Sequence, residues 1–164
     1  MVNAQTSTQS SAALDVFVRL LRAHAAVTRM LSAQLQHEHG LTINAYEALL
    51  QLSRTESPMR RVDLANTLLL TASGVTRLLD GLERSGLVAR KACPSDARAS
   101  YSELTDAGHA KLREASGSHI AAVRALLEER FEQDELGQLA SLLDRLPGVD
   151  PGASGEDCAP ADAA

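Results

Sequence analysis

The chain has 164 residues, a length typical of one domain with a sizeable core. Apolar residues make up 45 % of the chain but aromatic residues only 2 %, so the core must consist of leucine, alanine and valine, a composition that favours helices. No apolar run is long enough to span a membrane and no secretory leader is present at the N-terminus, so we expect a cytoplasmic protein without a membrane partner.

The two ends of the chain are expected to be disordered tails around one domain. Residues 1–10 are polar and aperiodic, and residues 147–164 are rich in proline, glycine, alanine and acidic residues. The domain between them begins with a helix over 11–39, whose apolar stripe has helical spacing and which ends at Gly40 as a left-handed C-cap would. This helix is longer than a small domain needs, so we expect part of its stripe to pack against another chain.

Two further helices are predicted before residue 70. Thr42 can cap a helix that runs to Leu52, and Ser57-Pro58 breaks the chain after it. The helix that follows is short and has its apolar positions on one side. These inward positions are Val62, Leu64, Ala65 and Leu68.

The next predicted helix carries small polar residues on its exposed side. Thr71 is a natural N-cap and Gly86 ends the helix. Its buried stripe contains Val75, Leu78, Leu79 and Leu82. The side facing away from that stripe begins with residues that can form hydrogen bonds and one long guanidinium: Thr71, Ser73, Gly74, Thr76 and Arg77.

A β-hairpin and two helices complete the predicted domain. Residues 87–92 have the pattern of a strand, 93–96 are turn residues, and 99–104 form the returning strand. Thr105 then caps a long helix, and the last amphipathic helix covers 133–146.

Charge is distributed unevenly along the chain, which has a formal net charge of −5. Residues 53–98 hold eight basic and five acidic residues, whereas the rest holds eight basic and 16 acidic residues. A basic segment between acidic ends is compatible with a nucleic-acid partner despite the negative total.

The order of a short helix, a tight turn, a capped helix and a basic hairpin predicts a mainly α-helical, winged helix-turn-helix fold. An α-helix fits the major groove of DNA, and its N-terminal residues reach the base edges. We therefore assign the exposed residues of the Thr71 helix to base contacts. The hairpin and its flanks are assigned to the phosphate backbone and minor groove, with Asp96 holding Arg98 at the hairpin tip. These flanking residues are Arg60, Arg61, Arg90, Lys91, Asp96 and Arg98.

The sequence resembles the MarR (multiple antibiotic resistance regulator) family of transcription regulators over residues 12–146. The resemblance rests on five blocks: Leu41-Thr42 before Glu47–Leu50, Leu64-Ala65, Val75–Asp80 with Leu82–Val88, Asp96–Ala99, and Leu104–Gly108. It implies a triangular homodimer in which 11–40 and 105–146 form the dimerisation helices and 41–104 the DNA-binding lobe. It also implies a repressor that binds an inverted-repeat operator and is released by a small-molecule effector.

The sequence leaves the controlling signal open. The resemblance places an effector pocket between the dimerisation helices and the DNA-binding lobe, near His24, Thr28, Arg29 and Tyr46. A zinc-responsive regulator of the same fold is the alternative, because imidazole suits zinc; its candidate ligands are His37, His39 and His109. No cofactor other than zinc is suggested. The sequence has no recognisable catalytic arrangement, so we expect no enzymatic activity.

Overall fold

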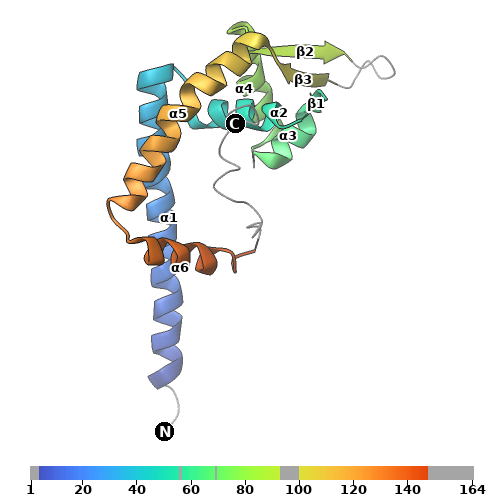
Figure 1. Ribbon diagram of the computed structural model, residues 1–164. Helices are drawn as coiled ribbons and strands as arrows, with labels where there is room; N and C mark the ends of the chain where they lie inside the picture. The colour runs from blue at the N-terminus through green and yellow to red at the C-terminus, as the bar shows by residue number, and fades with distance from the viewer. Residues whose placement is uncertain (1–3, 56, 69, 93–99, 148–164) are drawn as a thin grey trace.

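The computed structural model describes residues 4–55, 57–68, 70–92 and 100–147. These residues form helices and one small antiparallel sheet, as the sequence predicts (Figure 1). In chain order the elements are α1 (Ala4–His39), α2 (Ile43–Ser53), β1 (Met59–Arg60), α3 (Arg61–Thr67), α4 (Ala72–Arg84), β2 (Val88–Ala92), β3 (Ser100–Leu104), α5 (Asp106–Glu128) and α6 (Gln133–Leu143).

Helix α1 is the longest element and extends as an arm below the rest of the molecule (Figure 1). It begins at Ala4, so the predicted N-terminal tail over 1–10 is wrong from residue 4 onward. The segment lacks an apolar stripe but contains neither proline nor glycine, so nothing in it breaks a helix that continues into residues 11–39. The other end is confirmed, because Gly40 follows the helix with φ of +68°.

The hydrophobic core surrounds α2, which has apolar residues on most of its circumference. Leu49 of α2 is fully buried, and fully buried leucines from four other helices belong to the same core. These are Leu35 of α1, Leu64 of α3, Leu79 of α4 and Leu112 of α5. Burying each such side chain contributes about 1.5–3 kcal/mol, so this cluster fixes the two helices of the helix-turn-helix against the end of the arm.

Three threonines cap helices as predicted. The hydroxyl oxygens of Thr42, Thr71 and Thr105 each accept a hydrogen bond from the backbone N–H three residues later. Within α3 one expectation is wrong, because the side chain of Val62 is 55 % exposed whereas Leu64 and Ala65 are buried. A helix of seven residues turns only one narrow side toward the core, and Val62 lies outside it.

The sheet contains the predicted hairpin and one additional strand. β2 and β3 pair with Val88 opposite Leu104, and β1 pairs with the other edge of β3, giving the order β1-β3-β2. The sequence did not indicate β1, because two residues are too few to show an alternating pattern. The predicted turn over 93–96 lies outside the described residues.

The end of α4 is joined directly to the start of α5. The Thr105 hydroxyl donates a hydrogen bond to the Gly86 carbonyl at 2.7 Å, and the Thr105 N–H donates to the Leu87 carbonyl. Gly108 lies so close to the same Leu87 carbonyl that a Cβ atom would not fit. The DNA-binding lobe is therefore coupled to α5 through this corner.

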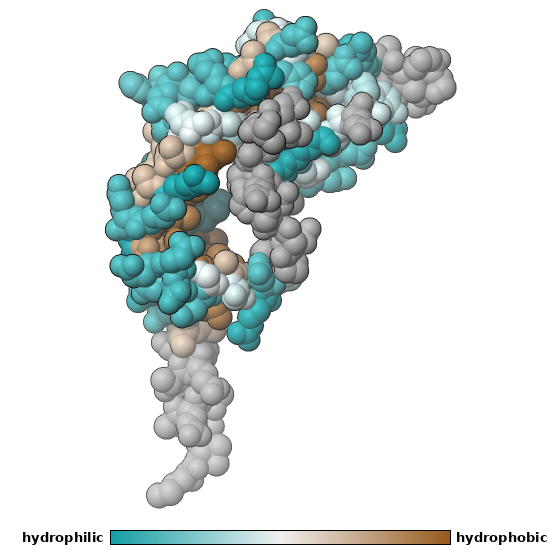
Figure 2. Space-filling view, viewed as in Figure 1, coloured by the Kyte–Doolittle hydropathy of each residue, from teal (hydrophilic) through white to brown (hydrophobic). Residues whose placement is uncertain are grey.

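The arm carries apolar side chains that the single chain leaves uncovered, shown as brown and tan atoms below the lobe in Figure 2. In the first half of α1 they include Phe17 and Leu21, which are 56 % and 53 % exposed. Helix α6 has no buried residue, and Leu142 is 57 % exposed. No helix among the described residues is both long and apolar enough to cross a membrane.

Candidate nucleic-acid interface

Helix α4 presents the predicted small polar residues at its N-terminal end. The Thr71 hydroxyl accepts from the Gly74 N–H at 3.1 Å and lies 3.2 Å from the Ser73 hydroxyl, while the Thr76 hydroxyl donates to the Ala72 carbonyl. These residues are exposed except Gly74, which is partly buried. A Cβ at Gly74 would lie 3.1 Å from the Thr71 hydroxyl, so this glycine also makes room for the cap.

The exposed side of α4 continues beyond Arg77. Residues three and four apart share a helix face, so Ser73, Thr76, Arg77, Asp80 and Arg84 form one row, all of them exposed. The Arg84 Nε donates to the Asp80 carbonyl at 3.1 Å, and no ion pair or hydrogen bond holds the Arg77 side chain within the described part of the chain. Asp80 could not be assigned to this surface from the sequence alone.

A second basic surface lies on the outer face of the sheet. Cross-strand partners point to the same face, and Tyr101 of β3 pairs with Arg60 of β1 on one side and with Lys91 of β2 on the other. The three side chains thus form a row with an aromatic ring between two cations. The sequence named Arg60 and Lys91 but missed Tyr101, because the pairing with β1 was not evident from the pattern.

The remaining wing residues have different surroundings. Lys91 forms an ion pair with Glu103 of the adjacent strand at 2.9 Å. Because Lys91 is exposed and Glu103 partly exposed, the pair contributes about 0–1 kcal/mol and can exchange partners. Arg90 pairs with Ser102 on the opposite face and is exposed. Asp96 and Arg98 lie outside the described residues, so their predicted contact remains a prediction.

Arg61 is the predicted DNA contact that the structure places elsewhere. Its side chain is only 15 % exposed and pairs with two carboxylates of α4, Asp80 at 3.2 Å and Glu83. The sequence assigned Arg61 to DNA because it is one of the basic residues of the segment 53–98. In the structure its guanidinium joins α3 to α4, and its contact with DNA stays a prediction.

The four residues predicted to line the effector pocket lie in two separate places in the structure. His24, Thr28 and Arg29 line an open hollow of about 600 Å³ along α1, and every lining residue comes from that helix. Tyr46 is not part of it, because its side chain is buried in the core against α5. Its hydroxyl lies 3.1 Å from the Ser116 hydroxyl and its ring 4.6 Å from the His119 ring.

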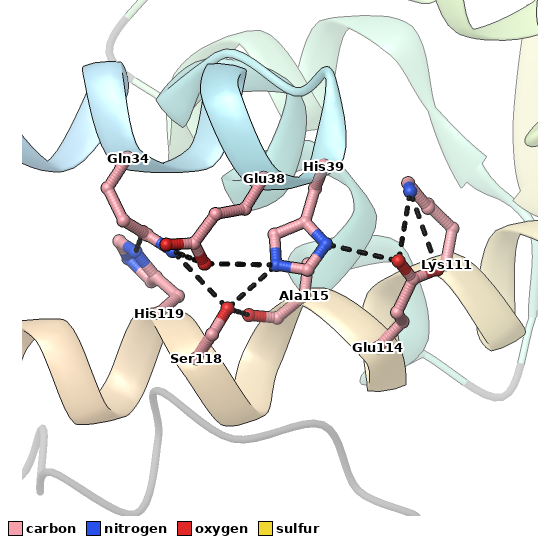
Figure 3. A network of polar contacts seen from close by, with 8 residues as sticks. All are labelled: Gln34, Glu38, His39, Lys111, Glu114, Ala115, Ser118 and His119. Atoms are coloured by element: carbon pink, nitrogen blue, oxygen red, sulfur yellow. Dashed lines mark hydrogen bonds and ion pairs between the residues drawn. The ribbon is translucent and has the colours of Figure 1, made fainter.

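A polar network connects the end of α1 to α5 (Figure 3). His39 contacts the Ser118 hydroxyl at 2.7 Å and the Glu114 carboxylate at 3.3 Å. Gln34 lies between the two helices, with its amide nitrogen 2.6 Å from the Glu38 carboxylate and its amide oxygen 3.3 Å from His119. This network fixes the C-terminal part of α1 against α5.

The candidate zinc ligands do not converge. His37 is exposed, and His39 is occupied by the network just described. His109 lies in the first turn of α5, by Glu103 and Thr55. Among the described residues no group of three or more histidine, cysteine, aspartate or glutamate side chains is arranged to hold a metal ion. The residues therefore do not fit the zinc site that the sequence left open.

The buried His119 makes stability depend on pH. Burial lowers the pKa of its imidazole, and the nearby His39 lowers it further. The unfolded chain therefore binds a proton more readily than the folded chain, so we expect the free energy of unfolding to fall as the pH falls below about 6.5. Denaturant titrations from pH 8 to pH 5 measure this slope, and His119→Gln should flatten it.

The carboxylates of the same network act in a separate pH range. Hydrogen bonds from Gln34 and Ser118 lower the pKa of Glu38, and hydrogen bonds from His39 and Lys111 lower the pKa of Glu114. Their contribution is present above the ordinary carboxyl pKa and is lost in more acidic solution. An undiminished slope between pH 6.5 and pH 5 in His119→Gln would contradict the assignment to His119.

Comparison with known sequences identifies relatives that cover most of the chain. A sequence profile described as the MarR family matches residues 39–99. The HTH-type transcriptional regulator YkoM of Bacillus subtilis (strain 168), itself uncharacterized, is 34 % identical over 106 residues, which are 65 % of this chain and 68 % of YkoM. The HTH-type transcriptional regulator MhqR of the same strain is 25 % identical over 122 residues, 74 % of this chain and 82 % of MhqR.

Solved structures share the fold. Sco3205 of Streptomyces coelicolor, a MarR family transcriptional regulator crystallised in complex with DNA, matches with a TM-score of 0.72 and 29 % identity over 78 % of this chain and 81 % of that chain. AbsC, a MarR family transcriptional regulator of the same organism, matches with a TM-score of 0.66 and 32 % identity over 79 % of this chain and 90 % of that chain.

Proposed function

The chain belongs to the MarR family of transcriptional regulators, and from this premise we propose that it acts as a homodimeric repressor on an inverted-repeat operator. The observation that carries the proposal is the pairing, in one lobe, of an exposed polar helix end with a basic sheet face. The proposed activity is binding rather than catalysis, and we place it in the cytoplasm, where the operator DNA lies.

Helix α4 is suited to the major groove. Its small N-terminal residues allow the helix end to approach the base edges closely, and the free backbone N–H groups there favour phosphate. Arg77 is the long side chain that extends from this end. In the proposed complex Ser73, Thr76 and Arg77 read bases, and the DNA complex of the relative Sco3205 supports this use of the fold.

The sheet supplies a second, less sequence-specific contact. Arg60 and Lys91 flank Tyr101 on the outer face, where both cations can meet a phosphate backbone. Because exposed ion pairs are weak, DNA phosphate can replace Glu103 as the partner of Lys91. These contacts add affinity and salt dependence without selecting a sequence.

The arm is proposed to join two copies of the chain. The uncovered apolar residues of α1 and α6 need a partner surface, since soluble chains rarely leave such a large apolar area in water. A two-fold dimer presents two α4 helices, which matches an inverted repeat with half-sites about one helical turn apart. The hollow along α1 would then be bordered by the second chain, and we propose it as the site of a small-molecule effector that releases DNA.

Selection of bound duplexes from genomic fragments, followed by a mobility shift, tests the proposal. We expect an inverted repeat to be recovered and its affinity to fall steeply with salt. If no genomic fragment is retained at low salt, including the promoter region of the chain's own gene, the proposal is contradicted. A thermal-shift screen of metabolites and phenolic acids identifies the effector, because a ligand of the folded state raises the melting temperature.

Arg77→Ala is expected to weaken operator binding by about 1–3 kcal/mol and to relax the preference at one or two base pairs, because a bidentate contact to a base is lost. Affinities for the operator and for single-base variants measure both effects. Arg54→Ala, which removes an exposed arginine at the end of α2, is the matched control and should leave the base preference unchanged. Equal affinities for parent and Arg77→Ala would show that α4 does not read bases through Arg77.

A further inference from the structure

Arg61 connects the two helices of the helix-turn-helix through their charges. It is the first residue of α3, and its two terminal nitrogens contact Asp80 and Glu83 on the second half of α4. The contact is partly shielded, since the Arg61 and Glu83 side chains are 15 % and 24 % exposed. The Arg61 Nε is buried and has no hydrogen-bond partner within the described residues, so α4 alone directs the guanidinium.

The position of Asp80 makes this pairing relevant to DNA. Asp80 lies in the exposed row of α4, three residues after Arg77 and four before Arg84. At these spacings an unpaired carboxylate would attract either arginine, and it would also repel phosphate. The Asp80 carboxylate pairs with Arg61 instead. Among the described residues, the Arg77 side chain has no hydrogen-bond or ion-pair partner, and that of Arg84 bonds only a backbone carbonyl.

We propose that Arg61 is a positioning residue that holds α4 in its DNA-reading orientation and keeps Arg77 available by binding Asp80 and Glu83. The proposal rests on the proposed DNA-binding function, which it deepens. It assigns Arg61 no contact with DNA. It also predicts that the acidic Glu83 increases the affinity for DNA, although DNA is an anion, because Glu83 holds the guanidinium that positions α4.

The test compares Arg61→Met, Glu83→Gln and the matched control Arg60→Met, all on the operator duplex recovered with the parent chain and on an unrelated duplex. Affinity is measured over a series of salt concentrations. Arg61→Met removes the charge and retains the length of the side chain, and Glu83→Gln removes one carboxylate with little change in volume. Arg60→Met removes a neighbouring arginine that is exposed. Melting temperatures show whether each variant folds.

We expect Arg61→Met to bind the operator about tenfold more weakly, roughly the loss of one good base contact. Its salt slope should match the parent, and its preference for the operator over the unrelated duplex should shrink. Glu83→Gln should also weaken operator binding, by about two- to fivefold. Arg60→Met should lower the salt slope by about one phosphate contact and keep the preference.

Two results would overturn the positioning role. A salt slope that falls by about one in Arg61→Met would show a phosphate contact, and tighter binding by Glu83→Gln would show that this carboxylate only repels DNA. If Arg61→Met does not fold, the operator affinity of Glu83→Gln tests the positioning role.

If the parent chain retains no duplex, the proposed DNA-binding function is contradicted. The positioning role is then tested by amide hydrogen exchange in α4, which should be faster in Arg61→Met than in Arg60→Met; equal exchange would contradict the role.

Discussion

Gly108→Ala is expected to lower the free energy of unfolding by about 3 kcal/mol, because the added methyl group has no space. A Cβ at this position would overlap the Leu87 carbonyl and lie 3.1 Å from the Leu104 Cδ2. The carbonyl cannot withdraw easily, since it also accepts a hydrogen bond from the Thr105 N–H at 3.2 Å. Removing the overlap therefore requires α5 to move away from Leu87, which connects α4 to β2.

Urea denaturation of the purified variant measures this loss. The matched control is Gly117→Ala in the same helix, where a Cβ would meet no atom within 4 Å. Alanine stabilises an exposed helix position relative to glycine by about 0.5–1 kcal/mol, so the two substitutions should change stability in opposite directions. Equal stability of Gly108→Ala and the parent would mean that the corner between α4 and α5 is more loosely packed than the structure shows.

Leu21→Glu is expected to separate the dimer and to weaken operator binding by on the order of 10²–10⁴-fold. Leu21 lies on the uncovered stripe of α1, and a carboxylate there would lose its water against the partner surface, at a cost of several kcal/mol for each unpaired ion. A single chain then reaches only one half-site, so the gain from binding two half-sites together is lost. Sedimentation measures the dimer, and a mobility shift measures the affinity.

Val62→Glu is the control for this substitution. Val62 of α3 is 55 % exposed, close to the 53 % of Leu21, but it lies in the lobe rather than on the arm. It should leave the sedimentation of the dimer unchanged. A dimer that persists in Leu21→Glu, or one that is lost equally in Val62→Glu, would place the interface outside the α1 stripe.

Much of the candidate interface was visible in the sequence because it depends on short-range patterns. Thr71 as a cap and the buried row of α4 follow from residues within a few helical turns, and the basic hairpin follows from two adjacent strand patterns with turn residues between them. The pairing of Arg61 with α4 could not be predicted in the same way. Its partners, Asp80 and Glu83, are 19 and 22 residues away, and no local pattern indicates which cation a carboxylate will bind.

The start of α1 and the predicted effector pocket are two further features at which the structure differs from the expectation. Residues 4–10 contain no residue that breaks a helix, and their polar composition alone does not distinguish a tail from the first turns of α1. Tyr46 and His24 were grouped from a family resemblance, yet Tyr46 lies in the core against His119, whereas His24 lines the open side of α1. Which side of a helix becomes a pocket depends on what packs beside it.

By itself, the sequence determined the helical class, the order of the elements, the threonine caps and the polar end of α4, because periodicity, capping and turn chemistry act over a few residues. Tertiary structure alone decided that β1 joins the sheet and places Arg60 beside Tyr101, that Gly108 closes onto the Leu87 carbonyl, and that Arg61 binds α4. These features depend on contacts between residues distant in the chain, and such contacts are fixed only when the core around α2 brings the elements together.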